Sequence, residues 1–160
     1  MDQLWAPWRL TYVVKPPPPT AGDDCFICRG LGERNDRQNL IIRRSEHSTV
    51  LLNRYPYNNG HLLVSPNRHV GRLDEMTSQE LLDVNEWLSR LVSLLETKMK
   101  PDGFNIGVNL GKVAGAGLPG HVHWHIVPRW NGDTNFMPVV GDVKVIVQSL
   151  DALYDLLAES

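Results

Sequence analysis

The chain is organised around one stretch, residues 121–130, which reads His121-Val122-His123-Trp124-His125-Ile126-Val127-Pro128-Arg129-Trp130. Histidine alternates with apolar residues, and side chains on a strand alternate between its two faces. As a strand, the stretch therefore places its three imidazoles on one face and directs the apolar residues between them into a core. A half-solvated polar face would explain such a row without any chemistry. Three of the chain's six histidines within five positions instead favour a site where imidazoles act as nucleophile, acid or metal ligand.

Length and composition limit the classes to which the protein can belong. Its 160 residues, 42% hydrophobic and 21% charged, fit one globular domain. Lys and Arg total 16 and Asp and Glu total 18, so the chain lacks the excess of basic residues that is typical of a nucleic-acid-binding protein. No apolar run reaches the roughly eighteen residues of a membrane span, and the start of the chain is not a signal peptide. We expect a cytoplasmic protein with neither nucleic acid nor membrane as a partner.

The first 24 residues differ in composition from the rest. Trp5, Trp8 and Tyr12 are concentrated near the terminus, and four successive prolines occupy positions 16–19. Aromatic side chains favour an arm that is held against the body or a partner subunit, and the prolines predict a stiff, extended connector. The sequence therefore predicts an N-terminal arm and connector over residues 1–24 and one folded domain over residues 25–160.

Hydrophobic periodicity predicts an α+β fold. A long helix is expected from Ser78 to Lys98, because Thr77 and Glu80 form a capping-box pattern and apolar residues recur every three or four positions. A shorter helix is expected over about 149–158. Strands are predicted over residues 40–43, 49–53, 61–65 and 104–109 and in the histidine stretch. Because the strands follow one another with few helices between them, we expect one antiparallel sheet of about five strands.

The histidine row suits attack on phosphorus. Neutral imidazole is a nucleophile near neutral pH, and it needs one ring nitrogen free while a hydrogen bond holds the other. His123, the middle member, is the candidate nucleophile, and His125 is the candidate donor to a phosphate oxygen or leaving group. The glycine-rich loop before the row, with Gly115, Ala116 and Gly117, is a candidate phosphate cradle. Glycine-rich loops between strands are also common without such a role.

Cys25 and Cys28 are the only cysteines in the chain. Their spacing fits a redox pair or half of a zinc site, and two free buried thiols are the simplest alternative. Zinc requires four ligands, so two more donors must come from elsewhere. His69, just after a predicted strand, and His121 are the obvious donors. His47 could replace His69.

Residues 121–127 match the His-φ-His-φ-His-φ-φ motif of the histidine triad family, where φ is apolar. Residues 52–64 and 107–115 resemble, in order, the family's nucleotide-binding hairpin and its phosphate-side loop, so the resemblance covers roughly residues 25–138. It implies a small α+β subunit, usually a homodimer. It also implies action on nucleoside 5′-phosphate esters, amidates and anhydrides through a nucleotidyl-histidine intermediate.

The resemblance assigns roles residue by residue. It makes His123 the nucleophile and His125 a contact of the transferred phosphate. His61 supports the triad by hydrogen bonding, Asn53 binds the ribose hydroxyls, and Asn109 lies near the α-phosphate. Each asparagine would also be accounted for as an ordinary turn-capping residue.

Residues 128–140 and the Leu4–Arg9 segment resemble the bacterial branch that includes diadenosine tetraphosphate phosphorylases. Those enzymes discharge the intermediate with inorganic phosphate in place of water. Some phosphorylases of the wider superfamily have Gln where this chain has His125, which leaves water and phosphate both open as acceptor. We expect cleavage of dinucleoside polyphosphates. The alternative is a nucleotide-binding interaction module with weak phosphoramidate or ester hydrolase activity.

Family members with this cysteine pair resemble galactose-1-phosphate uridylyltransferases in their zinc site. The resemblance implies a structural zinc ion held by Cys25, Cys28, His69 and His121. Four protein ligands leave no open position for water, so a zinc-dependent hydrolase is disfavoured. The site would fix the N-terminal segment of the domain to the histidine stretch.

Overall fold

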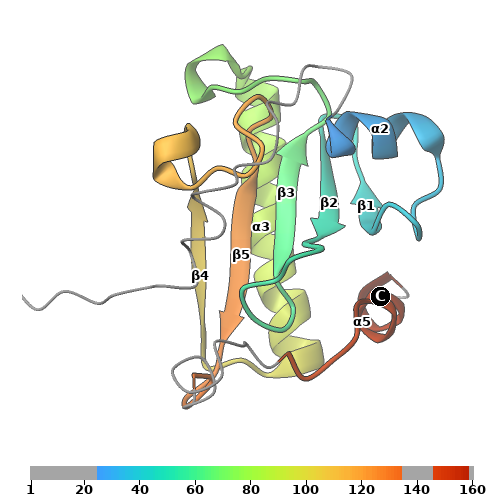
Figure 1. The fold of residues 1–160 in the computed structure, drawn as a ribbon, viewed down its shortest axis with the longest axis vertical. Coiled ribbons are helices and arrows are strands. Elements are labelled where there is room, and N and C mark those ends of the chain that lie inside the picture. The colour runs from blue at the N-terminus through green and yellow to red at the C-terminus, as the bar shows by residue number, and fades with distance from the viewer. Residues whose placement is uncertain (1–24, 135–145, 159–160) are drawn as a thin grey trace, which may run out of the picture.

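Five antiparallel strands form one sheet in the order β1-β2-β3-β5-β4 (Figure 1). This computed structural model describes residues 25–134 and 146–158. The strands are β1 (Ile41–Arg44), β2 (Ser48–Leu52), β3 (Leu62–Pro66), β4 (Gly103–Val108) and β5 (Trp124–Arg129). The predicted α+β class and the five-stranded antiparallel sheet are confirmed. The predictions for residues 1–24 fall outside the described residues, as does the part of the 128–140 resemblance that follows residue 134.

The strands predicted over residues 49–53 and 61–65 are present as β2 and β3, which form an antiparallel hairpin. Leu51 pairs with Leu63 and Leu52 with Leu62, and the connecting loop returns the chain at Gly60. Gly60 has a φ of +75°, and a Cβ at this position would lie 2.9 Å from the Sδ atom of Met99. Glycine meets both the backbone and the space requirement here.

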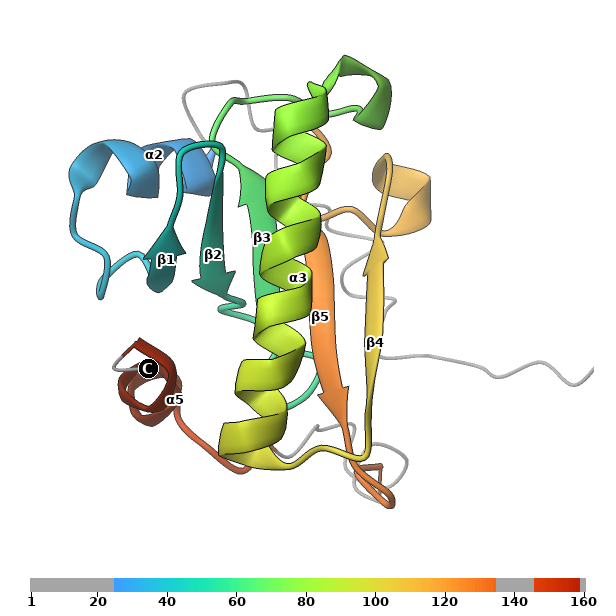
Figure 2. The same ribbon diagram turned by 180° about the vertical axis from the view of Figure 1, so that it is seen from behind.

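Helix α3 (Ser78–Met99) covers one face of the sheet (Figure 2). The predicted capping box is present. The Thr77 side chain accepts a hydrogen bond from the Glu80 backbone N–H, and the Glu80 carboxylate accepts one from the Thr77 N–H. These two bonds satisfy backbone donors that the first helical turn leaves unpaired. The sequence therefore located the start of this helix correctly.

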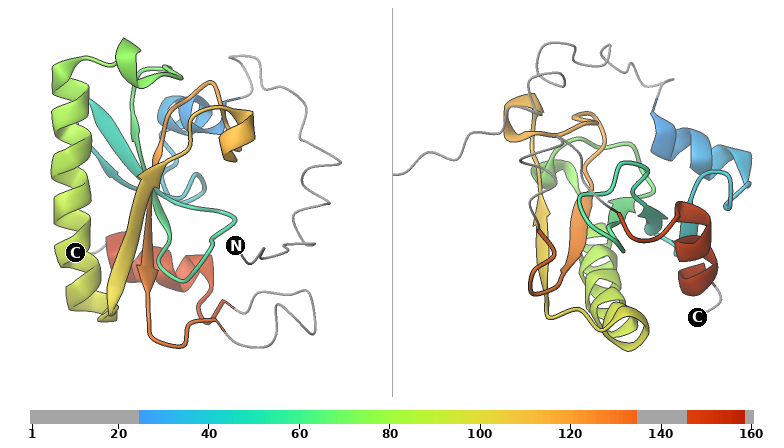
Figure 3. Two further views of the ribbon diagram at one scale, coloured as in Figure 1. Left: turned by 90° about the vertical axis from the view of Figure 1, so that its left-hand side faces the viewer. Right: turned by 60° about the horizontal axis from the view of Figure 1, so that its bottom comes forward.

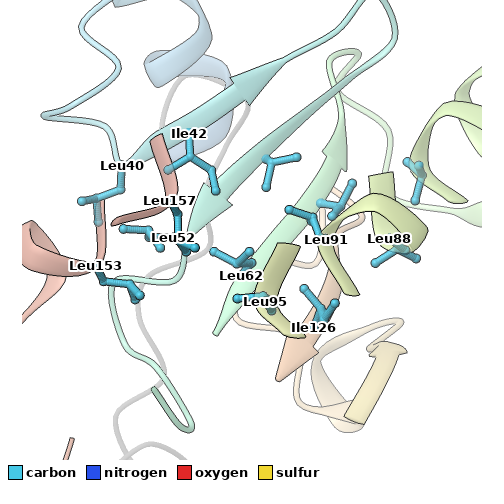
Figure 4. Close-up of a cluster of buried hydrophobic side chains, with 13 residues drawn as sticks. Leu40, Ile42, Leu52, Leu62, Leu88, Leu91, Leu95, Ile126, Leu153 and Leu157 are labelled. Carbon is cyan, nitrogen blue, oxygen red and sulfur yellow. The ribbon is translucent and has the colours of Figure 1, made fainter. Parts of the chain in front are cut away.

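The main core lies between α3 and the sheet (Figure 4). Leu91 and Leu95 of α3 meet Leu62 of β3 and Ile126 of β5 in one buried cluster. Helix α5 (Leu150–Ala158) extends the cluster around the β1 edge, since its buried residues Leu153 and Leu157 pack with Leu40 and Ile42. Alternation along the strands directs the intervening side chains to the opposite face.

That opposite face carries the short elements (Figure 3). Helix α2 (Phe26–Glu33) and the 3₁₀ turn η4 (Lys112–Ala114) lie on the side of the sheet away from α3, and the 3₁₀ turn η3 (Leu73–Glu75) precedes α3. None of the described helices has both the length and the apolar character that a membrane crossing requires.

The histidine stretch differs from the prediction in one respect. Strand β5 begins at Trp124, so His121 and His123 precede the ladder. The carbonyl of His121 accepts a hydrogen bond from the ring of His123 at 2.8 Å, and the Val122 N–H donates to the Val70 carbonyl, outside the sheet. Alternation nevertheless persists, since Val122 is buried and Trp124 packs against the main core.

Candidate functional site

His123 presents one free ring nitrogen to a pocket. Its Nδ1 lies 2.8 Å from the carbonyl oxygen of His121, and a carbonyl only accepts, so Nδ1 carries the proton. Nε2 then holds the lone pair. Of the described residues, none forms a hydrogen bond with this atom, and the side chain lines the pocket. The backbone thus fixes the tautomer that a nucleophile needs.

His125 is held in the opposite tautomer, with its proton on Nε2. Two hydrogen bonds fix it, from the Tyr57 backbone N–H to His61 and from His61 to His125. The N–H of Tyr57 donates to Nδ1 of His61 at 2.9 Å, so Nε2 of His61 carries a proton. This Nε2 lies 2.9 Å from Nδ1 of His125, which must accept. The proton of His125 is therefore on Nε2, a buried atom with no hydrogen-bond partner in the described part of the chain. The network sets a lone pair on His123 beside an N–H donor on His125.

Burial keeps both imidazoles neutral. It lowers the pKa of His123 below its ordinary value. Burial, followed by the neighbouring charge of His123, lowers the pKa of His125 to about 4. The two rings lie 5.1 Å apart between centroids. Near neutral pH the pair therefore consists of a nucleophile and a neutral hydrogen-bond donor.

The pocket in front of these histidines has a volume of about 880 Å³, which is within the roughly 300–1,000 Å³ range of small-molecule sites. Its floor includes Leu51 and Leu63, which form a small buried cluster with Ile41 on the face of the sheet away from α3. Phe26 of α2 and Leu118 contribute further apolar walls. An apolar cavity that ends at two imidazoles suits a ligand with a flat apolar part and an anionic end.

The predicted ribose ligand Asn53 lines this pocket. Its Oδ1 accepts a hydrogen bond from the Tyr55 N–H at 2.9 Å, and its Nδ2 lies 3.2 Å from Nδ1 of His61. His61 is buried, so its part is to hold His125. Asn109 directly follows β4 and is not among the residues that line the pocket.

The glycine-rich loop meets the pocket at Gly115 and Gly117, whereas Ala116 is buried and does not line it. The N–H of Gly115 donates to the Lys112 carbonyl and the N–H of Ala116 to the Gly111 carbonyl. These bonds close a tight turn in which Gly115 has a φ of +92°. Of the three predicted cradle residues, Gly117 is the one whose N–H has no acceptor among the described residues.

Sequence reasoning missed a clip that holds the loop between β2 and β3. Nδ2 of Asn58 donates to the Pro128 carbonyl at 3.0 Å and to the Asp133 carboxylate at 2.8 Å. Arg129 pairs with the same carboxylate and, with hydrogen bonds, lowers the pKa of Asp133 below its usual range. The clip fixes the loop that supplies the Tyr57 N–H. In the sequence, residues 55–60 indicated only a turn, so no pattern marked Asn58.

The four predicted metal ligands come together at the other end of the histidine stretch. The donor atoms of Cys25, Cys28, His69 and His121 all lie within 4.8 Å of one another. Nδ1 of His121 is 3.2 Å from Sγ of Cys25, and Nδ1 of His69 is 3.3 Å from Sγ of Cys28. Zinc with sulfur and nitrogen ligands separates its donors by roughly 3.3–3.8 Å. His47, the alternative to His69, is not part of the cluster.

The orientation of His121 fits a metal ligand. Its Nε2 lies 2.8 Å from the Pro66 carbonyl, to which it must donate, so Nδ1 directs a lone pair at the two thiols. Burial lowers the pKa of His121 to about 4, and burial together with Cys25 raises the pKa of the Cys28 thiol to about 11. These two thiols and two imidazoles could together hold one metal ion.

The structure thus combines an antiparallel sheet, a row of histidines and a pocket lined by His123 and His125. The HIT domain family matches residues 34–132. The chain belongs to the histidine triad family.

Individual relatives sharpen this assignment. An AP-4-A phosphorylase from Mycobacterium tuberculosis is 35% identical over 162 residues, which cover 99% of this chain and 83% of that protein. A bis(5'-adenosyl)-triphosphatase from Dictyostelium discoideum is 40% identical over 95 residues, or 58% of this chain and 62% of that protein. A zinc-bound histidine triad family protein from Mycobacterium smegmatis has the same fold, with a TM-score of 0.68 and 23% identity over 87% of this chain and 94% of that one.

Proposed function

We propose that the protein is a nucleotidyl transferase or hydrolase that cleaves dinucleoside polyphosphates through a nucleotidyl-histidine intermediate. The observation that carries the proposal is the pair of opposite tautomers at the pocket. Nε2 of His123 holds a lone pair, and Nε2 of His125 holds a proton. Relatives whose names state that they act on dinucleoside polyphosphates support this substrate class.

The first chemical step forms one bond and breaks one. Nε2 of His123 attacks the α-phosphorus of the substrate, and the bond from that phosphorus to the bridging oxygen of the departing nucleotide breaks. The proton on Nδ1 of His123 keeps its hydrogen bond to the His121 carbonyl, which stabilises the positive charge that the ring acquires. The Nε2–H of His125 donates to a phosphate oxygen or to the leaving oxygen, where negative charge develops.

The second step returns the enzyme to its starting state. Water or inorganic phosphate attacks the same phosphorus, the bond to Nε2 of His123 breaks with its electron pair returning to that nitrogen, and the proton of an attacking water passes to solvent. Water yields a nucleoside monophosphate and phosphate yields a nucleoside diphosphate. In this scheme Asn53 binds the ribose hydroxyls, while the Gly117 N–H and Asn109 contact the phosphate side. Gly115 and Ala116 hold the turn that presents Gly117.

The metal cluster is proposed to hold one structural zinc ion through Cys25, Cys28, His69 and His121. When bound, the ion supplies cross-linking and no chemistry, because four protein ligands leave no open position. The ligands join the start of α2 to the residues that precede β5. The Pro66 carbonyl orients His121 from outside the ligand shell. Loss of the metal would therefore loosen the segment that leads to His123.

A second copy of this chain is the proposed partner. Strand β4 lies at an edge of the sheet and carries exposed Ile106, and Leu110 and Val113 beyond it are also exposed. An edge strand with exposed apolar side chains is covered in many proteins by another subunit. The homodimer implied by the family resemblance is expected to use this edge.

One assay tests the proposed function. The protein is incubated with diadenosine tetraphosphate in the presence and absence of inorganic phosphate, and the products are separated. ADP and ATP formed only with phosphate identify a phosphorylase, whereas AMP and ATP formed in either buffer identify a hydrolase. Binding of AMP without turnover of this substrate would contradict the proposal and leave a binding module.

A further inference from the structure

A second, smaller cavity adjoins the nucleotide pocket. Its volume is about 410 Å³, and its lining is Asn35, Arg37, Gln38, Leu40, Arg54, Leu150 and Asp151. Leu40 and Arg54 line both cavities. The two spaces therefore meet at Arg54, the first residue after the predicted ribose ligand Asn53. Most of the lining is polar, so this space suits a charged group better than a nucleobase.

Arg54 has no carboxylate partner in the described part of the chain. Its Nη2 donates one hydrogen bond, at 3.3 Å, to the Gln38 carbonyl. The other arginine of the cavity, Arg37, is paired with Asp155 and, at 3.8 Å, with Asp151. Carboxylates also pair with Arg44, Arg68, Arg72, Arg90 and Arg129. Arg54 thus retains most of its guanidinium donors for a ligand.

Arg54 lies in the pocket beside Asn53, the residue proposed to bind the ribose hydroxyls. Arg54 follows β2 and His125 lies on β5, with β3 between them, because Leu51 pairs with Leu63 and Leu63 pairs with His125. The backbones of Leu51 and His125 are therefore two strand spacings apart, or roughly 10 Å. With the 5′-phosphate at the histidines and the ribose hydroxyls on Asn53, as proposed above, the 2′ and 3′ oxygens lie at the end of β2 beside Arg54.

We propose that Arg54, at the mouth of the polar cavity, binds a second phosphate carried on the 2′ or 3′ oxygen of the ribose. The protein would then accept nucleoside bisphosphate groups as well as simple nucleotides. Guanidinium recognises phosphate through paired hydrogen bonds. Arg37 lies at the far side, where Asp155 and Asp151 already offset its charge, so Arg54 is the group that would hold the phosphate. The proposal rests on the proposed function, since it requires the 5′-phosphate to lie at the histidines.

Calorimetric titration tests this subsite. AMP, adenosine 3′,5′-bisphosphate and adenosine 2′,5′-bisphosphate are titrated into the full-length protein and into Arg54→Met. One of the bisphosphates is expected to bind the native protein about tenfold more tightly than AMP, as a charge-assisted hydrogen-bond pair would give. In Arg54→Met the ratio of the two affinities should fall to about one. Arg90→Met, which removes a surface charge on α3, should keep the native ratio.

Two results would overturn the subsite. Equal affinities for AMP and both bisphosphates in the native protein would do so, as would a gain that survives in Arg54→Met. Failure of AMP itself to bind would instead contradict the proposed function. Arg54 is exposed, and the thermal midpoint of Arg54→Met, measured beside the titrations, shows that the variant is folded.

Discussion

The two ends of the histidine stretch use the same side chain in opposite tautomers. At the metal cluster, His121 donates from Nε2 to the Pro66 carbonyl and directs Nδ1 at the thiols. Two residues later, His123 donates from Nδ1 to the His121 carbonyl and directs Nε2 into the pocket. One backbone oxygen in each case decides which ring nitrogen has the lone pair. Backbone acceptors, rather than the imidazoles themselves, therefore divide this row into a metal end and a chemical end.

Removal of the pocket histidine should give the largest effect. His123→Ala is expected to lower turnover of diadenosine tetraphosphate by at least about 10³-fold, because His123 is the proposed nucleophile and alanine cannot form the covalent intermediate. Metal content should stay at the native level, since the ligands of the other end are intact. Steady-state rates and metal analysis of the same preparation measure both. Turnover close to the native rate would contradict a covalent intermediate on His123.

Removal of one thiol should abolish metal binding at the cluster of Cys25, Cys28, His69 and His121. Cys25→Ala is expected to lose the zinc ion, which we predict at about one per chain, and to lower the thermal midpoint by about 10 °C. Residual activity should fall less than in His123→Ala. Elemental analysis and thermal unfolding report the two quantities. A folded, active native protein without zinc would contradict this prediction.

A change at the loop clip should act on the pocket through His61. Asn58→Ala removes the hydrogen bonds to Pro128 and Asp133 and so releases the Tyr57 N–H that fixes the His61 tautomer. We expect kcat to fall about tenfold with a smaller change in KM, because His125 loses its fixed proton position. Asn59→Ala is the matched control, since Asn59 bonds instead to Gln148. An unchanged kcat in Asn58→Ala would show that the Asn58 hydrogen bonds do not control the tautomer of His125.

The smallest effect concerns the residue beside a metal ligand. Arg68 precedes His69 and holds the buried Glu80, whose pKa falls to about 2, with the Arg68 hydrogen bond as the main cause. A lowered carboxyl pKa stabilises the fold above the ordinary value near 4.5 and ceases to do so as pH falls through 2. Because Arg68 is half-exposed, Glu80→Gln should cost about 1 kcal/mol at pH 7.

That difference in unfolding free energy should shrink between pH 5 and pH 2. Urea unfolding of both proteins across this window measures it. A gap that stays constant down to pH 2 would show that the ion pair does not set the acid stability of this region.

Local patterns predicted most of the elements. The capping box at Thr77 and Glu80 marked the start of α3, and period-two alternation located β2 and β3 within one residue. These signals are predictable because they depend on neighbours within a few positions. The pattern failed at His121 and His123, which precede β5, since the Val122 N–H between them bonds to the Val70 carbonyl outside the sheet. Alternation still placed the imidazoles and the apolar residues on opposite faces.

The sequence by itself determined the residue types of the site: three alternating histidines, a cysteine pair and the α+β order of elements. Only the tertiary structure decided which nitrogen of each ring is free, because the atoms that fix the tautomers come from distant or non-patterned positions, such as the Pro66 carbonyl and the Tyr57 N–H. It also brought Arg54 to the mouth of a second cavity. Hydrogen-bond partners are set by long-range packing, and no local pattern of residues carries that information.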